Sequence, residues 1–205
     1  MHRLISTSLL LVAGGCAATS PGAPEPPAPG MAQISGLALP ERVADFQLRM
    51  AGSLPDGVIE FNYFAPSPRG PTVSVRFPPP PDGLDVSVLR EAVEAHVSAF
   101  LSSRIGQGRG QASAVEPFEV TGTDRQVYDG WCASMWHEGS RLLQWICYFE
   151  KQERLVMLYI LDDNFSPSVT PSFVREFLSG ALGGLVVASA RGSNRELLLR
   201  GLPAW

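Results

Sequence analysis

Three cysteines are the residues whose type and spacing most clearly suggest chemistry. Cys132 and Cys147 lie in two strand-like segments separated by the turn sequence Glu138-Gly139-Ser140. A two-residue hairpin loop at Gly139-Ser140 would place the cysteines directly opposite each other, and a four-residue loop would keep the same partners. Residues paired in this way are within disulfide range. The sequence therefore predicts a Cys132–Cys147 bridge.

Such a pair could instead serve redox chemistry. Thioredoxin-like chemistry, however, uses a Cys-x-x-Cys motif at a helix start, where the thiol pKa is lowered. The pair here lies in mid-strand, flanked by Trp131 and Ile146. We therefore expect a structural disulfide, and closing a loop of about 16 residues stabilises a fold by roughly 3 kcal/mol in the chain-entropy model.

The third cysteine, Cys16, follows an N-terminal segment with the layout of a secretory signal peptide. One positive charge precedes a mostly apolar stretch over residues 4–12 and three small residues at 13–15. The segment 9–16, Leu-Leu-Leu-Val-Ala-Gly-Gly-Cys, resembles the lipobox of bacterial lipoproteins. That resemblance implies a signal peptide over residues 1–15 and lipidation of Cys16. Ala13 stands where these proteins usually have leucine, and cleavage to a soluble periplasmic form is the alternative.

Residues 16–33 are rich in proline and alanine and are expected to form a disordered tether. An extended tether of about fifteen residues at ~3.1 Å each would reach roughly 45 Å. Lipidation of Cys16 would also leave the other two cysteines as a pair, as expected in an oxidising compartment. Ala17, in place of aspartate after the lipid cysteine, suggests the outer membrane, with the domain facing the periplasm.

Other residues that could support catalysis or metal binding are better explained structurally. His96 borders the apolar face of a predicted helix, and His137 is expected to be solvated beside a turn. No Gly-x-Ser-x-Gly elbow and no clustered zinc ligands are present in the sequence. Asp162-Asp163-Asn164 lacks the spacing of a calcium loop and is expected to be a solvated strand end. We predict no enzyme activity and no cofactor.

Two pairs of carboxylates and one glycine-rich run also have structural explanations. Glu91 and Glu94 fit a solvated helix face, and Glu116 and Glu119 fit the edge of a strand. The run 106–110 follows a helix, whereas loops that cradle phosphate precede one, so we expect a linker.

Composition limits the class of protein. The chain has 16 basic and 20 acidic residues and is 45% hydrophobic, so it can form a sizeable core but lacks the basic surface of a nucleic-acid binder. We expect one domain over residues 34–190 and a C-terminal tail over 191–205.

Hydrophobic periodicity predicts the elements that hold these residues in place. Residues 58–64 and 72–77 alternate around a Pro/Gly turn and predict a β-hairpin, preceded by a weaker strand at 46–50. Residues 86–105 have the apolar period of an amphipathic helix. In the second hairpin strand, Val73, Val75 and Phe77 share one face, and Ser74 and Arg76 share the other.

The C-terminal half predicts a three-stranded meander over residues 125–137, 141–150 and 154–161. The last of these strands is apolar throughout, which is typical of a central strand. Thr170-Pro171 predicts the capped start of a second amphipathic helix. Residues 185–190 could form a further strand or continue that helix.

These elements predict an α+β fold, with a hairpin and a meander packed against two helices. The order of elements resembles the PsbP/Mog1-like domain, through Thr72-Val-Ser-Val75 before the first helix and Val120-Thr-Gly-Thr-Asp-Arg-Gln126 before the meander. The resemblance spans roughly residues 45–182 and implies a non-catalytic binding or assembly role.

Aromatic residues of the meander are the remaining candidates for a binding surface. Period-two alternation puts Trp136 and Trp145 on the face of the cysteines, and Trp131 and Tyr148 on the other. An open face would mark a partner or ligand site, whereas two covered faces would be core. The leading hypothesis is a membrane-anchored domain that binds or scaffolds a protein partner. The alternative is a soluble or tethered carrier of a small apolar or glycan ligand.

Overall fold

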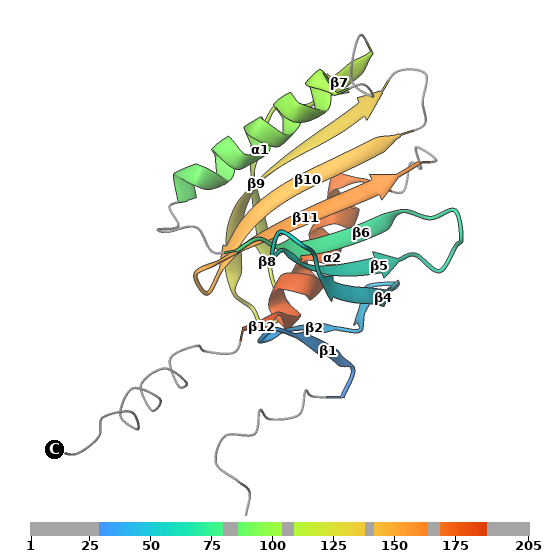
Figure 1. Ribbon diagram of the computed structural model, residues 1–205, viewed down its shortest axis with the longest axis vertical. Coiled ribbons are helices and arrows are strands. Elements are labelled where there is room, and N and C mark those ends of the chain that lie inside the picture. Colours follow the sequence, from blue (N-terminus) through green and yellow to red (C-terminus); the bar gives the residue numbers. More distant parts are fainter. Residues whose placement is uncertain (1–28, 80–85, 104–108, 138–141, 164–168, 188–205) are drawn as a thin grey trace, which may run out of the picture.

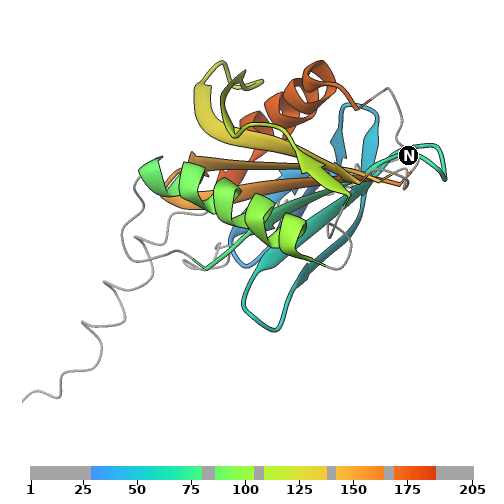
Figure 2. The same ribbon diagram turned by 90° about the horizontal axis from the view of Figure 1, so that it is seen from above.

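The computed structural model describes residues 29–79, 86–103, 109–137, 142–163 and 169–187, which form an α+β fold. Two helices lie on opposite faces of a large antiparallel sheet (Figures 1 and 2). The predicted signal peptide, Cys16, the loop at 138–140 and the C-terminal tail lie outside the described residues.

The large sheet contains both the predicted hairpin and the predicted meander. Within the described residues its strands run in the order β3 (Arg42–Val43), β4 (Phe46–Ser53), β5 (Ile59–Phe64), β6 (Thr72–Phe77), β11 (Arg154–Asp162), β10 (Leu143–Lys151), β9 (Val127–His137) and β7 (Gly110–Ala112), with β8 (Glu116–Thr121) also on β9. Strand β6 pairs with β11, and this pairing joins the hairpin to the meander. Strand β11 is central, as its continuous apolar sequence predicted.

A small second sheet lies beside the large one. It consists of β1 (Met31–Ile34), β2 (Leu37–Pro40) and β12 (Val186–Val187), with β2 in the middle. Strand β1 begins within the segment that we assigned to the tether, so the fold starts earlier than predicted. Leu37 and Leu39 of β2 are fully buried, and this burial holds the segment on the domain. Strand β12 shows that Val186 and Val187, directly after Leu185, form a strand.

Helix α1 (Val86–Ser102) covers one part of the large sheet. Leu89 and Val93 are buried against Met135 of β9 and Ile146 of β10, in one apolar cluster. The main contacts of α1 with the sheet are to β9, β10 and β7. Leu155 and Met157 of β11 are also buried in the α1 cluster, whereas β6 and β5 lie beside the helix.

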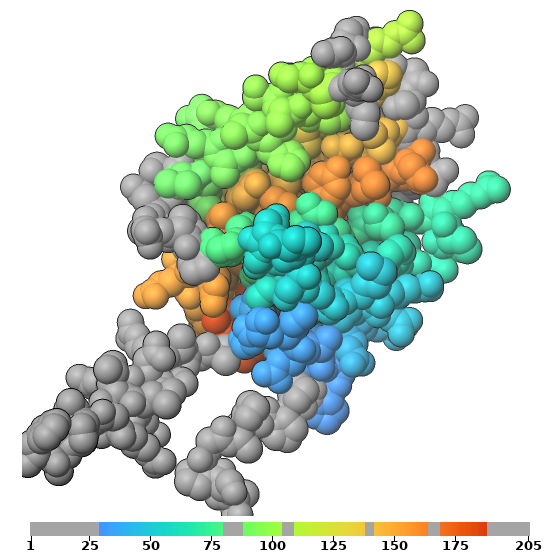
Figure 3. All heavy atoms as spheres, viewed as in Figure 1, coloured from blue at the N-terminus to red at the C-terminus, as the bar shows by residue number. Residues whose placement is uncertain are grey.

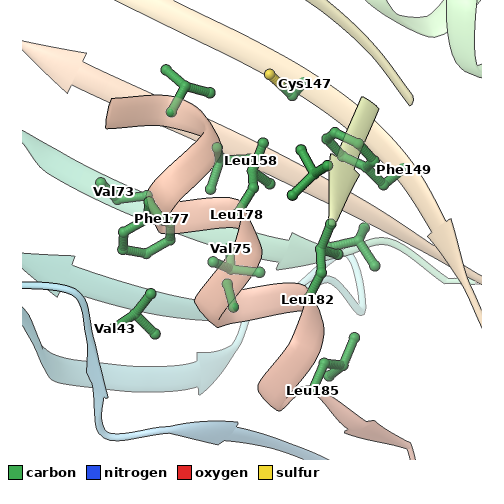
Figure 4. Close-up of a cluster of buried hydrophobic side chains, with 14 of the residues drawn as sticks. Val43, Val73, Val75, Cys147, Phe149, Leu158, Phe177, Leu178, Leu182 and Leu185 are labelled. Atoms are coloured by element: carbon green, nitrogen blue, oxygen red, sulfur yellow. The ribbon is translucent and has the colours of Figure 1, made fainter. Parts of the chain in front are cut away.

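Helix α2 (Pro171–Gly184) lies on the opposite face and forms the larger core. The hydroxyl of Thr170 caps it by accepting a hydrogen bond from the amide of Phe173 at 3.2 Å, as the sequence predicted. Phe177 and Leu178 are buried against the sheet side chains of Val73 and Leu158 (Figure 4). The apolar stripe of this helix thus follows its predicted periodicity.

The predicted cysteine pairing is confirmed. Cys132 pairs directly with Cys147 in the ladder of β9 and β10, and the two residues form a disulfide with their Cα atoms 4.2 Å apart. That separation matches a non-hydrogen-bonded pair, which is the register that the longer hairpin loop produces. The bridge lies on the α2 face, within the larger core.

A buried lysine joins the end of α2 to the β8–β9 turn. The Lys151 ammonium donates to the carbonyl of Leu182, lies 3.3 Å from the carboxylate of Asp124, and lies 5.0 Å from the ring centre of Tyr128. The Tyr128 hydroxyl donates to Asp124 at 2.5 Å. This hydrogen bond, together with the Lys151 charge, lowers the pKa of Asp124 below its ordinary value of 3.8. The cluster therefore contains a carboxylate paired with a buried cation.

Candidate functional site

The four aromatic residues singled out by the sequence do not form an open face. Trp131, Trp136 and Trp145 are half-buried, and Tyr148 is 9% exposed beneath α1. Arg90 of α1 lies over the ring of Trp131, 5.4 Å from its centre. The period-two assignment of faces is correct, because the α1 cluster contains Trp131 and Tyr148 and the α2 cluster contains Trp145 and the cysteines.

Other predicted positions agree with the structure in part. Glu91, Glu94, Glu116 and Glu119 are exposed, as expected of a helix face and a strand edge. His137 is half-buried rather than solvated. Asp162 is fully buried at the end of β11, so the expectation of a solvated strand end is wrong there. Its strand passes through the centre of the sheet, and the core extends to its last residue.

The exposed part of the sheet lies beside α1, on β4, β5, β6 and the C-terminal part of β11. Its side chains point to the α1 side because Tyr159, which packs against the α1 cluster, pairs with Ser74, and Ser74 pairs with Asn62. We call this surface the open sheet face (Figure 3), and it comprises Met50, Glu60, Asn62, Phe64, Thr72, Ser74, Arg76, Tyr159 and Leu161. Most of these residues are half-buried, and Met50 is 60% exposed.

Polar side chains occupy the middle of the open sheet face. Arg76 donates its Nε–H to the Glu60 carboxylate at 2.6 Å, and the Ser74 hydroxyl donates to the Asn62 amide oxygen at 2.5 Å. Burial raises the pKa of Glu60, but hydrogen bonds from Asn62 and Arg76 and the charge of Arg76 outweigh it and bring that pKa below its ordinary 4.5. Glu60 is therefore ionised at neutral pH.

Aromatic rings border this polar centre on the α1 side. The guanidinium of Arg76 lies over the ring of Tyr159, 5.6 Å from its centre, and the His96 ring of α1 lies 6.0 Å from the same ring. Burial lowers the pKa of His96, and the charge of Arg76 lowers it further. Burial raises the pKa of Tyr159 and of Tyr148. These side chains are all neutral at pH 7, so Arg76 and Glu60 carry the charge in the middle of the face.

A pocket of about 370 Å³ lies at one end of the open sheet face. Phe64, Thr72 and Leu161 form its floor, and the β5–β6 turn at 65–68 and Gly70 form one wall. Arg49 lies at its rim over the Phe64 ring, 5.7 Å from the ring centre. None of the described residues that line this pocket is a tryptophan.

The arrangement offers hydrogen-bond donors and aromatic surface rather than an activated nucleophile. The hydroxyl of Ser74 donates to an amide oxygen and not to a histidine. Across the ranges that the structure describes, no three His, Cys, Asp or Glu side chains group together as metal ligands do.

The comparisons with known proteins assign the chain to no family. No protein-family model matches the sequence, and no curated protein matches it. The resemblance to the PsbP/Mog1-like domain stays a prediction. Among the described residues, neither helix has the length and apolar character that crossing a membrane requires.

Sequence reasoning missed the open sheet face, although part of the signal was present. The alternation in 72–77 already separated Ser74 and Arg76 from the core valines. The residues Glu60 and Asn62 alternate in the same way in the preceding strand. Pairing the two polar faces across the predicted hairpin would have indicated a polar surface there.

Proposed function

We propose that the chain is a membrane-anchored lipoprotein whose domain binds a protein partner through the open sheet face. One observation carries the proposal: the main contacts of α1 are with β7, β9 and β10, so the same face stays partly exposed over β5, β6 and the C-terminal part of β11. The uncovered part combines Met50, Phe64, Tyr159 and Arg76. Methionine, aromatic residues and arginine are enriched at protein interfaces.

A protein partner fits this surface better than a small ligand does. The open sheet face extends across four strands, from Met50 on β4 to Tyr159 on β11, well beyond the pocket at its end. A ligand carrier buries most of its ligand in a concave site. Of the aromatic residues expected to line such a site, Tyr148 is buried, and Trp131 and Trp145 pack against the two cores.

A carrier of a small apolar or glycan ligand is the second candidate. The volume of the pocket, about 370 Å³, falls within the usual range for small-molecule sites, and Phe64 gives it an aromatic floor. Binding of a ligand that protects the pocket residues alone, with no protein bound to the rest of the face, would favour this function.

The proposed anchor agrees with the position at which the chain enters the domain. Strands β1 and β12 flank β2 in the small sheet, at one end of the domain (Figure 1). A tether from a lipidated Cys16 would join the domain at β1, and the open sheet face would then lie to the side of the attachment point. In this position the face could contact a partner near the outer membrane from the periplasm.

The intact mass of the protein extracted from its native membrane tests the anchor. We expect a chain that begins at Cys16 with added acyl groups and gains two hydrogens on reduction of the Cys132–Cys147 bridge. An unmodified chain in the soluble fraction would contradict the anchor and would favour the carrier function.

A photo-cross-linking amino acid at Met50 tests the binding surface in cells. Val127, which is 57% exposed in the β8–β9 hairpin, is a matched control because it is also an exposed apolar residue outside the open sheet face. We expect a discrete cross-linked protein from position 50 and none from position 127. Equal products from both positions, or none from either, would overturn the proposed surface.

A further inference from the structure

We infer that the protein partner presents a carboxylate to Arg76, through an acidic segment that lies across the open sheet face. The inference rests on the proposed function and specifies the chemistry of the partner at that surface. It follows from how Arg76 is held and from which of its hydrogen-bond donors are used.

Only one edge of the Arg76 guanidinium is used within the domain. Its Nε–H donates to Glu60, and among the described residues the guanidinium makes no other hydrogen bond. The side chain is 33% exposed on the open sheet face. An arginine with two free amino groups presents the paired donors that bind a carboxylate in bidentate fashion.

The guanidinium is also fixed in place before any partner binds. Glu60 holds its Nε edge at 2.6 Å, and the ring of Tyr159 lies beneath it at 5.6 Å. A side chain held on two sides loses little conformational freedom on binding, and this makes each new hydrogen bond more favourable. The ion pair with Glu60 therefore positions Arg76 and leaves its outer donors unused.

A second arginine on the same surface has a similar arrangement. Arg49 lies over the ring of Phe64 at 5.7 Å and borders the pocket at the end of the face. Two stacked arginines along one surface suit an extended segment with more than one carboxylate. The acidic residues along this surface are Glu60, which is bound to Arg76, and Asp163 in the pocket wall.

Two synthetic peptides test this chemistry on the full chain. One is an acetylated and amidated nonapeptide with glutamate at alternate positions, and the other has glutamine at those positions. We expect the glutamate peptide to shift the NMR signal of the Arg76 Nε–H in a saturable manner. We expect the glutamine peptide to bind at least about tenfold more weakly, because a neutral amide forms weaker hydrogen bonds with arginine.

Two variants separate the role of Arg76 in binding from its role in the ion pair. Arg76→Gln removes the proposed donor, whereas Glu60→Gln breaks the same ion pair and keeps the arginine. We expect Arg76→Gln to abolish binding of the glutamate peptide, which is monitored through the signals of neighbouring backbone amides. Glu60→Gln should weaken binding less than Arg76→Gln does, because the arginine remains but is no longer held by the ion pair. Equal binding of both peptides, or unchanged binding by Arg76→Gln, would overturn the inference.

The two experiments distinguish failure of the carboxylate inference from failure of the proposed function. If the cross-link from Met50 persists but the glutamate peptide shows no dependence on Arg76, the partner surface stands and the carboxylate inference fails. If no cross-link forms from Met50, the proposed surface itself fails.

Discussion

Two halves of one sheet face differ in what their side chains do. Under α1, Ile146 of β10 is fully buried among apolar residues. Across the sheet, Ile146 pairs with Tyr159, Tyr159 pairs with Ser74, and Ser74 pairs with Asn62. Along this row of cross-strand partners the side chains change from apolar and buried to polar and half-buried. The position of α1 thus divides a single face into a buried apolar part and a half-buried polar part.

The largest loss of stability is expected from a substitution in the half that α1 covers. Ile146→Ala should lower the free energy of unfolding by about 2–5 kcal/mol, because it leaves a cavity in a fully buried cluster. Asn62→Ala, in the same row of the open half, should cost only about 1–2 kcal/mol through loss of its hydrogen bonds with Ser74 and Glu60. Urea denaturation of the two variants measures the difference, and equal losses would contradict the division.

Removal of the disulfide should cause the next largest loss of stability. Replacing both Cys132 and Cys147 with alanine should lower the free energy of unfolding by roughly 3 kcal/mol, since it removes the cross-link between neighbouring strands. Reduction of the wild-type protein should have a similar effect. In conditions where the double variant is folded, it should still cross-link from Met50, because the bridge lies on the α2 face. Loss of that cross-link in the folded variant would show that the two faces are not independent.

Acid should weaken the fold through two carboxylates, Asp124 near α2 and Glu60 on the open sheet face. Both have a pKa lowered below the ordinary values of 3.8 and 4.5, so both bind a proton less readily when folded. Their contribution is complete above those ordinary values and is lost as the pH falls through the lowered ones. Stability measured by denaturation between pH 7 and pH 2.5 should therefore fall below about pH 4.5.

Single variants test whether these two carboxylates cause the loss of stability in acid. Asp124→Asn and Glu60→Gln should each flatten the fall in stability below about pH 4.5, because an amide cannot take up the proton. Variants whose pH dependence parallels that of the wild type would show that these carboxylates do not carry the effect.

The smallest effect on stability is expected at Met50. Met50→Ser should change the free energy of unfolding by no more than about 0.5 kcal/mol, because the side chain is 60% exposed. The same change should reduce the amount of partner recovered after chemical cross-linking of cells, relative to the wild type. Val127→Ser is the control and should change neither quantity. Undiminished recovery by Met50→Ser would place the interface elsewhere.

Sequence patterns predicted most of the local structure. The alternation in 58–64 and 72–77 predicted both strands of the hairpin, and Thr170-Pro171 predicted the start of α2. The register of Cys132 with Cys147 could be worked out because a short loop connects their strands. In each case neighbouring residues decide the structure, so local patterns are sufficient.

The open sheet face depends on contacts that local patterns do not encode. The pairing of β6 with β11 joins residues more than eighty positions apart, and this pairing brings Tyr159 next to Ser74 and Arg76. The apolar stripe of α1 predicted that the helix would pack on a sheet, but not which strands it would cover. The burial of Asp162 was missed for the same reason.

Hydroxyl-radical footprinting of the wild-type protein in native membranes tests most directly whether the open sheet face is covered by a partner. Met50 is exposed in the isolated domain and reacts readily with hydroxyl radicals, and the similarly exposed Val127 is an internal reference. We predict that Met50 is oxidised several times more slowly in native membranes than in the purified protein, with no change at Val127. Equal oxidation of Met50 in both preparations would contradict the account.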